Sequence, residues 1–96
     1  MSSKVALLHL ELHVAQAFDL KDKRRVVKSF KDRVANAFPV SIAEVDGLDS
    51  HRRCVLAVAM VSNDGQFIET VLRKIESQAA MHRDMLLVKS ELEWLK

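Results

Sequence analysis

The sequence predicts one α+β domain in which strands and helices follow the order β-α-β-β-α-β. Three observations predict this order. Apolar residues alternate with a period of two in four segments, they recur with the helical period in two others, and Asp, Gly and Pro mark the boundaries between segments. The chain has 96 residues, 49% hydrophobic and 29% charged, which is enough for one core in a single domain spanning 1–96.

The first predicted strand covers residues 5–14. Successive side chains of a strand point to opposite faces, so the wholly apolar set is expected to face the core. That set is Ala6, Leu8, Leu10, Leu12 and Val14, and the opposite set is Val5, Leu7, His9, Glu11 and His13.

A helix is predicted from about residue 20 to 37. Asp19 is the expected N-cap, with Asp22 three residues further on. Pro39 ends the helix, because proline lacks a backbone N–H and disfavours a helical residue before it. Apolar residues recur between these limits at helical spacing, at Leu20, Val27, Phe30, Val34 and Phe38.

Three further strands and a second helix follow. Residues 40–45 form a short strand that ends at the turn Asp46-Gly47, and residues 52–62 are apolar on both faces, as in a central strand. A helix over about 64–79 begins at Asn63 or Asp64, and an edge strand lies near 84–94. Right-handed connections then place strands one and three in the middle of a four-stranded antiparallel sheet, with both helices on one face. This is the ferredoxin-like arrangement.

The other face of this sheet is expected to be apolar and uncovered. Large apolar patches are rarely left in water, so a two-fold homodimer through this face is predicted, the alternative being a monomer that tolerates the exposure. The residues expected there are Val5, Leu7, Val55, Ala57, Ala59, Val61 and Leu87.

Composition excludes several activities found on this fold. The single cysteine, Cys54, allows neither an iron–sulfur cluster nor an intramolecular disulfide, and a reducing, cytoplasmic location is expected. No apolar stretch is long enough for a signal peptide or a membrane anchor. The loop at 15–18 has no Gly or Arg for an acylphosphatase cradle, and strands one and three have no aromatic residue for RNA-recognition-motif stacking. No nucleophile is paired with a base, so a protein without catalytic residues or cofactors is predicted.

Several single residues have a structural explanation. His9 and His13 lie about 13 Å apart on a strand, too far to share one metal ion within a protomer, so His9, Glu11 and His13 are expected at a polar sheet end or in an interface. Cys54 is expected in the core, and His51 and His82 in solvated loops. Met60, Met81 and Met85 are expected to fill the core.

The first helix concentrates positive charge. Seven basic and two acidic residues lie between Lys21 and Arg33, although the whole chain carries only +2. A solvated row of cations can neutralise several phosphates, which predicts contact with nucleic acid, the alternative being a solvated face without a partner. The row is Lys21, Arg24, Lys28 and Lys31, with Arg25 beside it, and all five are expected to be exposed.

Four stretches resemble the YlxP-like family of small bacterial proteins of unknown function: residues 10–13, 20–29, 40–45 and 58–64. The most specific are Leu-Lys-Asp-Lys-Arg-Arg at 20–25 and Ser-Asn-Asp at 62–64, and the resemblance spans about residues 4 to 95. It implies a ferredoxin-like fold and a gene often found among translation genes, near an initiation factor and a ribosome-binding factor. It therefore implies a role in ribosome assembly or translation, and it supplies no catalytic residue. Val55 departs from the polar residue expected there, which strengthens the dimer prediction.

The sequence thus favours a protein that associates with RNA or a ribosomal subunit through the basic helix. The alternative is a homo-oligomeric scaffold or small-ligand-binding module that acts through the open sheet face.

Overall fold

The computed structural model describes the whole chain, residues 1–96, and contains four strands and two helices. The predicted order is confirmed, and every boundary lies within two residues of the expected one. The elements are β1 (Lys4–His13), α1 (Leu20–Ala37), β2 (Ser41–Asp46), β3 (Arg53–Ser62), α2 (Gly65–Ala80) and β4 (Leu86–Trp94).

The strands form one antiparallel sheet in the order β2-β3-β1-β4. The two central strands pair along their whole length, from Lys4 opposite Ser62 to His13 opposite Arg53. Residues that lie opposite each other share a face, so the even-numbered side chains of both strands point the same way. This arrangement confirms the α+β, ferredoxin-like prediction.

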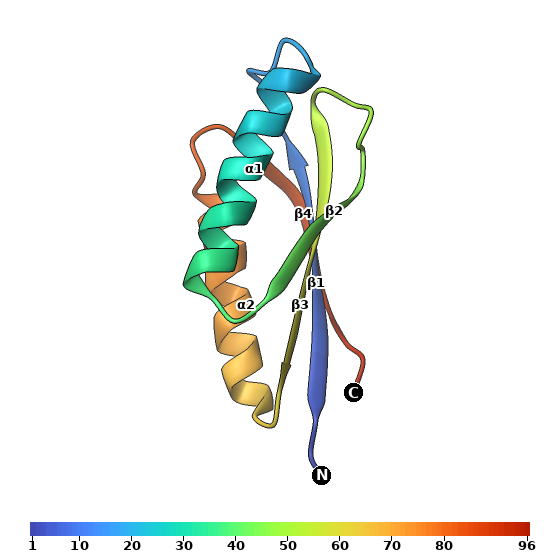
Figure 1. Cartoon of the computed structure of the whole chain (residues 1–96), viewed down its shortest axis with the longest axis vertical. Helices are drawn as coiled ribbons and strands as arrows, with labels where there is room; N and C mark the ends of the chain where they lie inside the picture. Colours follow the sequence, from blue (N-terminus) through green and yellow to red (C-terminus); the bar gives the residue numbers. More distant parts are fainter.

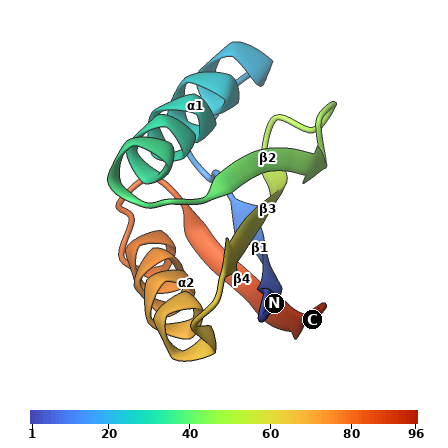
Figure 2. The same ribbon diagram turned by 60° about the horizontal axis from the view of Figure 1, so that its bottom comes forward.

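Both helices lie on this even-numbered side, and the other face of the sheet carries no helix (Figure 1). α1 packs on the edge strand β2, whereas α2 packs on β1, β3 and β4. The helices are also staggered, with α1 over one end of the sheet and α2 over the end where both termini lie (Figures 1 and 2). Neither helix has the combination of length and apolarity that crossing a membrane requires.

The core fills the space between the helices and the sheet. Cys54 and the apolar faces of both helices belong to it, as predicted, but Met81 is 84% exposed, so its assignment to the core is wrong. The strand contribution comes from Ala6, Leu8, Leu10, Leu12, Cys54, Leu56, Val58 and Met60, all of them at most 3% exposed.

Aspartate caps begin both helices, as their positions in the sequence predict. Asp19 Oδ1 accepts the backbone N–H of Asp22 at 2.8 Å, and Asp22 Oδ2 in turn accepts the N–H of Phe18 at 3.2 Å. Asp64 Oδ1 accepts the N–H groups of Gln66 and Phe67 at 3.0 and 3.2 Å. These bonds satisfy donors that the first turn of a helix leaves without a partner.

One member of the predicted open face lies on the opposite side. The pairing of β1 with β4 shifts register between Glu11 and Leu12, so Leu87 lies opposite the buried Leu12 and packs against the core. The prediction for Leu87 is wrong because it assumed an unbroken alternation, and a bulge inserts one extra residue, Val88, into β4.

Candidate nucleic-acid interface

α1 presents four of the five predicted cations to solvent, namely Lys21, Arg24, Arg25 and Lys28. Two of them have carboxylate neighbours on the same helix. Arg25 Nη2 lies 2.6 Å from Asp22 Oδ1, and Lys28 Nζ lies 2.6 Å from Asp32 Oδ2. Both cationic side chains are nevertheless 74% exposed, and ion pairs that exposed are weak in water, so a phosphate can compete for them.

Lys31 is half-buried, so the expectation that all five cations are solvated is wrong for this residue. It follows the buried Val27 by four residues and precedes the buried Val34 by three, which places it beside the core-facing stripe of α1. Its charge is close enough to act on Cys54 of β3. Lys31 therefore lies on the flank of α1 that faces the sheet.

Lys23 is the one charged residue that is fully buried, and it belongs to the same basic segment. Its Nζ donates to Glu44 Oε2 at 2.5 Å and to the carbonyl oxygen of Gly47 at 2.6 Å. This buried ion pair joins α1 to β2 and to the following turn. One of the seven positive charges is therefore neutralised inside the protein and is not available to a ligand.

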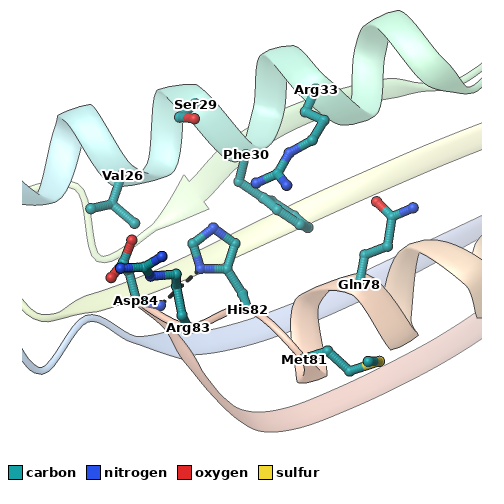
Figure 3. A pocket seen from close by; sticks show the side chains of 9 residues that line it. All are labelled: Val26, Ser29, Phe30, Arg33, Gln78, Met81, His82, Arg83 and Asp84. Atoms are coloured by element: carbon teal, nitrogen blue, oxygen red, sulfur yellow. Dashed lines mark hydrogen bonds between the residues drawn. The ribbon is translucent and has the colours of Figure 1, made fainter.

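The opposite flank of α1 borders a hollow of about 450 Å³ between α1, the end of α2 and the loop that follows it. Arg33 reaches into this space from α1, and Gln78 reaches into it from α2 (Figure 3). Its lining consists of Val26, Ser29, Phe30, Arg33, Gln78, Met81, His82, Arg83 and Asp84.

His82 forms the contact between the two helical regions. Its ring packs edge-on against Phe30, with centroids 5.8 Å apart and planes at 80°, and its Nδ1 accepts the backbone N–H of Asp84 at 3.0 Å. The neutral ring therefore carries its proton on Nε2. Burial, and then the charge of Arg33, lower the pKa of His82 below 6.5. The expectation that His82 is simply solvated is wrong, because it packs against a residue 52 positions earlier in the chain.

A second hollow, of about 520 Å³, continues from the first along α1. The two share Val26, Ser29 and Asp84, so together they form one trough, which we call the interhelical trough. At its far end lies Phe18, which is 84% exposed. The cationic row indicated only the outer face of α1. Arg33 and Arg83 were missed because neither lies on that row.

The uncovered face of the sheet is divided into an apolar half and a charged half. The charged half contains Arg53, which lies 3.2 Å from Asp46 and 3.4 Å from Glu11. The hydrogen bond from Gly47 N–H, followed by that from Arg53, lowers the pKa of Asp46. The other six apolar residues predicted for the uncovered face lie on it, and five of them form its apolar half: Val5, Leu7, Ala57, Ala59 and Val61, the last 66% exposed. Val55 lies opposite Glu11 and beside Arg53, in the charged half.

The predicted metal and cysteine positions show no reactive arrangement. His9, Glu11 and His13 lie on the uncovered face, and no group of three or more His, Cys, Asp or Glu side chains is arranged to hold a metal ion. Burial, followed by the charge of Glu44, raises the pKa of the Cys54 thiol from 9.0 to about 12. A thiol with such a pKa stays protonated at neutral pH and is a poor nucleophile.

Comparison with solved structures supports the fold alone. The chain aligns over 99% of its length with part of a hydantoinase/carbamoylase family amidase from Burkholderia ambifaria, at a TM-score of 0.54 and 9% identity. It aligns over 100% of its length with part of the extracellular region of zebrafish Gpr126/Adgrg6, at a TM-score of 0.52 and 14% identity. The chain spans only 28% and 14% of those two longer proteins.

Sequence comparison identifies the family. The chain is 32% identical over 71 residues to the uncharacterized protein YlxP of Bacillus subtilis (strain 168), an alignment that covers 74% of this chain and 77% of that protein. The family model described as "Protein of unknown function (DUF503)" matches residues 5–92. These matches confirm the resemblance to YlxP-like proteins, and the chain belongs to the DUF503 family.

Proposed function

We propose that this protein is a non-enzymatic factor that associates with RNA or with a ribosomal subunit through the outer face of α1. One observation carries the proposal. After every ion pair is taken into account, this face still presents Lys21 and Arg24 without a carboxylate partner and Arg25 and Lys28 in exposed pairs. Lys31 adds its charge from the flank of the same helix.

The expected binding is electrostatic and only weakly dependent on sequence. Each phosphate that a Lys or Arg neutralises releases a counterion, so affinity falls steeply as salt rises. The side chains on this face are long and exposed, and none is fixed in a geometry that selects a particular base. We therefore expect RNA backbone contacts from α1 itself.

The absence of catalytic function is part of the proposal. No Ser, Cys or Lys nucleophile lies within hydrogen-bonding distance of a His base, and the Cys54 thiol is buried and protonated. The buried Lys23 is held by Glu44 and Gly47, which gives it a structural role.

Fluorescence anisotropy with a labelled fragment of ribosomal RNA tests this proposal. The triple variant Lys21→Glu, Arg24→Glu and Lys28→Glu is expected to bind at least tenfold more weakly than wild type at about 50 mM salt, and wild-type affinity is expected to fall sharply by about 200 mM. A matched control, Lys4→Glu, Lys89→Glu and Lys96→Glu, makes the same change in net charge on other exposed positions. Equal losses in both variants would show that only net charge matters and would contradict a site on α1.

Co-sedimentation with ribosomal particles extends the test to the proposed partner. Wild type is expected to migrate with the particles at low salt and to leave them at high salt, and the α1 variant is expected to remain free at both. A wild-type protein that never migrates with the particles would restrict the proposal to free RNA.

A second candidate function, a homodimeric scaffold, is favoured by the apolar half of the uncovered sheet face. A two-fold axis parallel to the strands would bring apolar half onto apolar half. It would also bring the charged halves together, where Arg53 and Lys89 of one protomer can meet Glu91 of the other. Sedimentation velocity tests this candidate, with Leu7→Glu expected to convert a dimer into a monomer. A wild-type protein that is monomeric at all concentrations would eliminate it.

A further inference from the structure

We infer that the interhelical trough binds unpaired ribonucleotides, with a phosphate between Arg33 and Arg83 and a base against Phe18. This inference rests on the proposed association with RNA and names the part of the surface that would select single-stranded segments. The outer face of α1 offers charge alone, whereas the trough combines charge, free hydrogen-bond donors and an exposed aromatic ring.

The cations of the trough are free. Arg33 and Arg83 are exposed and have no hydrogen-bond or ion-pair partner. Both charges act on the ring of His82, so both guanidinium groups lie around the same part of the hollow. A guanidinium group offers several donors in one plane and is well suited to bind a phosphate oxygen pair.

Further donors point into the same space. His82 uses Nδ1 to accept from Asp84, which leaves the Nε2–H as a donor without a partner in the protein. The Gln78 carboxamide and the Ser29 hydroxyl also make no hydrogen bond, and Gln78 points into the hollow in Figure 3. A base that enters the trough would therefore find both donors and an amide acceptor for its edges.

Two carboxylates border the trough and restrict where a phosphate can lie. The Asp22 carboxylate already accepts from the Arg25 guanidinium and from the backbone N–H of Phe18, so its charge is partly compensated. Asp84 has no cationic partner and would repel a phosphate on its side. The phosphate is therefore expected between the two arginines but closer to Arg33, on the α1 side of the hollow.

Phe18 is the most exposed aromatic residue of the chain, whereas the uncovered face of the sheet has no aromatic side chain. Its side chain is 84% exposed beside Arg25, although a phenylalanine is normally buried. A base can stack on such a ring only if it is not already stacked in a duplex. The volume of either hollow, about 450 and 520 Å³, lies within the range of small-ligand sites, roughly 300–1,000 Å³.

The combination of cations, free hydrogen-bond donors and an exposed aromatic ring predicts a preference for single-stranded RNA. A duplex can contact the row on the outer face of α1 but cannot place a base in the trough without unpairing. A single strand can contact the row and the trough together. The preference should therefore depend on Phe18, Arg33 and Arg83, whereas affinity for a duplex should depend on the α1 row.

Anisotropy titrations with a single-stranded RNA of about 12 nucleotides, a length within the range that such surfaces cover, and with a hairpin of the same composition test the inference. Phe18→Ala and the double variant Arg33→Gln with Arg83→Gln are each expected to weaken single-strand binding about tenfold and hairpin binding about twofold or less. The double variant Lys74→Gln with Lys89→Gln is the control for charge, since it removes two exposed cations elsewhere. If both trough variants bind the single strand as wild type does, while the α1 triple variant does not, the trough inference is overturned and the proposed function survives.

A second titration separates the inference from the proposed function. Arg33 and Phe18 lie at opposite ends of the trough, about 20 Å apart along α1, so the probe is a uridine trinucleotide, which can reach both. It is added to the wild-type protein and followed by NMR, with inorganic phosphate as the comparison. Shifts of Phe18, Gln78 and His82 with the trinucleotide and not with phosphate support a nucleotide site even if long RNA does not bind. Equal shifts with both probes, or none with either, would overturn the nucleotide site whatever the α1 row does.

Discussion

α1 and α2 cover the same face of the same sheet, but they are held there differently. α2 lies over β1, β3 and β4 and buries only apolar residues: Ile68, Val71, Leu72, Ile75 and Ala79. α1 lies over the edge strand β2 and buries Val27, Phe30, Val34 and the charged Lys23. The buried face of α2 makes only hydrophobic contacts, and its one side-chain hydrogen bond to the sheet, from Ser90 of β4 to Glu76, is exposed. The buried face of α1 also depends on an ion pair.

The difference explains why the candidate interface lies on α1. A helix over the centre of a sheet is surrounded by apolar side chains, so a charge on its inner face would have no partner. A helix over an edge strand lies close to turns, whose carbonyl groups are free to accept, and Lys23 reaches such a carbonyl at Gly47. α1 can therefore carry cations around most of its circumference, whereas α2 provides the stable base.

The substitution expected to have the largest effect on stability is Leu72→Ala in α2. Leu72 is 0% exposed, so its truncation leaves a cavity and is expected to lower the free energy of unfolding by about 4 kcal/mol. Phe67→Ala on the same helix is the control, since Phe67 is 48% exposed, and it is expected to cost far less. Urea denaturation measures both. Equal costs would show that α2 does not depend on its buried stripe.

Lys23→Ala in α1 is expected to lower the free energy of unfolding by about 3 kcal/mol, because it leaves Glu44 and the Gly47 carbonyl poorly solvated and without a partner. Lys21→Ala, on the exposed side of the same helix, is expected to change stability by about 0.5 kcal/mol or less. Urea denaturation again gives the two values. The double variant Lys23→Met with Glu44→Gln is expected to recover part of the loss, and a further loss instead would show that the charges themselves are needed.

Gly47 belongs to the turn that accepts a hydrogen bond from Lys23, and Gly47→Ala is expected to lower the free energy of unfolding by about 2 kcal/mol. Gly47 has a φ of +76°, and an added Cβ would lie 2.6 Å from the carbonyl oxygen of Arg53. Gly65→Ala is the matched control, because its Cβ would meet only the Trp94 ring, at 3.6 Å, and alanine favours the first turn of α2. Thermal unfolding is expected to show a lower Tm for the first variant and an equal or higher Tm for the second. A Tm that does not fall in Gly47→Ala would show that the turn can relax.

Much of this arrangement was predictable from local patterns. The alternation in β1 and β3, the caps at Asp19 and Asp64, and the proline after α1 each depend on neighbouring residues only. Each of these features was confirmed.

The remaining features depend on contacts between distant segments. The bulge that moves Leu87 is a property of the β1–β4 pair, and the burial of Lys23 depends on Glu44, 21 residues later. In the sequence Lys23 is one of several cations in a basic segment, and nothing in its neighbouring residues distinguishes it from Lys21. The trough was missed for the same reason, since Phe30 and His82 meet only in the folded chain.

The smallest expected effect concerns His82, where the region after α2 contacts α1. The pKa of His82 is lowered below 6.5 by burial, then by Arg33 and Arg83, while Asp84 opposes them. The unfolded chain therefore binds more protons at this site as pH falls through about 6.5, and this contribution makes the folded state less stable at acid pH. Above that pH both states are neutral at this site and the contribution vanishes.

His82→Asn removes the titration while keeping an acceptor for the Asp84 N–H. The fall in Tm between about pH 7.5 and about pH 5.5 is expected to be smaller in His82→Asn than in wild type, by about 2 °C. The two proteins differ only at residue 82, so the difference between the two falls isolates His82. Arg33→Gln should lie between the two, because it removes only one of the charges that oppose protonation. An identical fall in all three proteins would mean that folding does not lower the pKa of His82, and the contact between the two helical regions would then not favour the neutral ring over the protonated one.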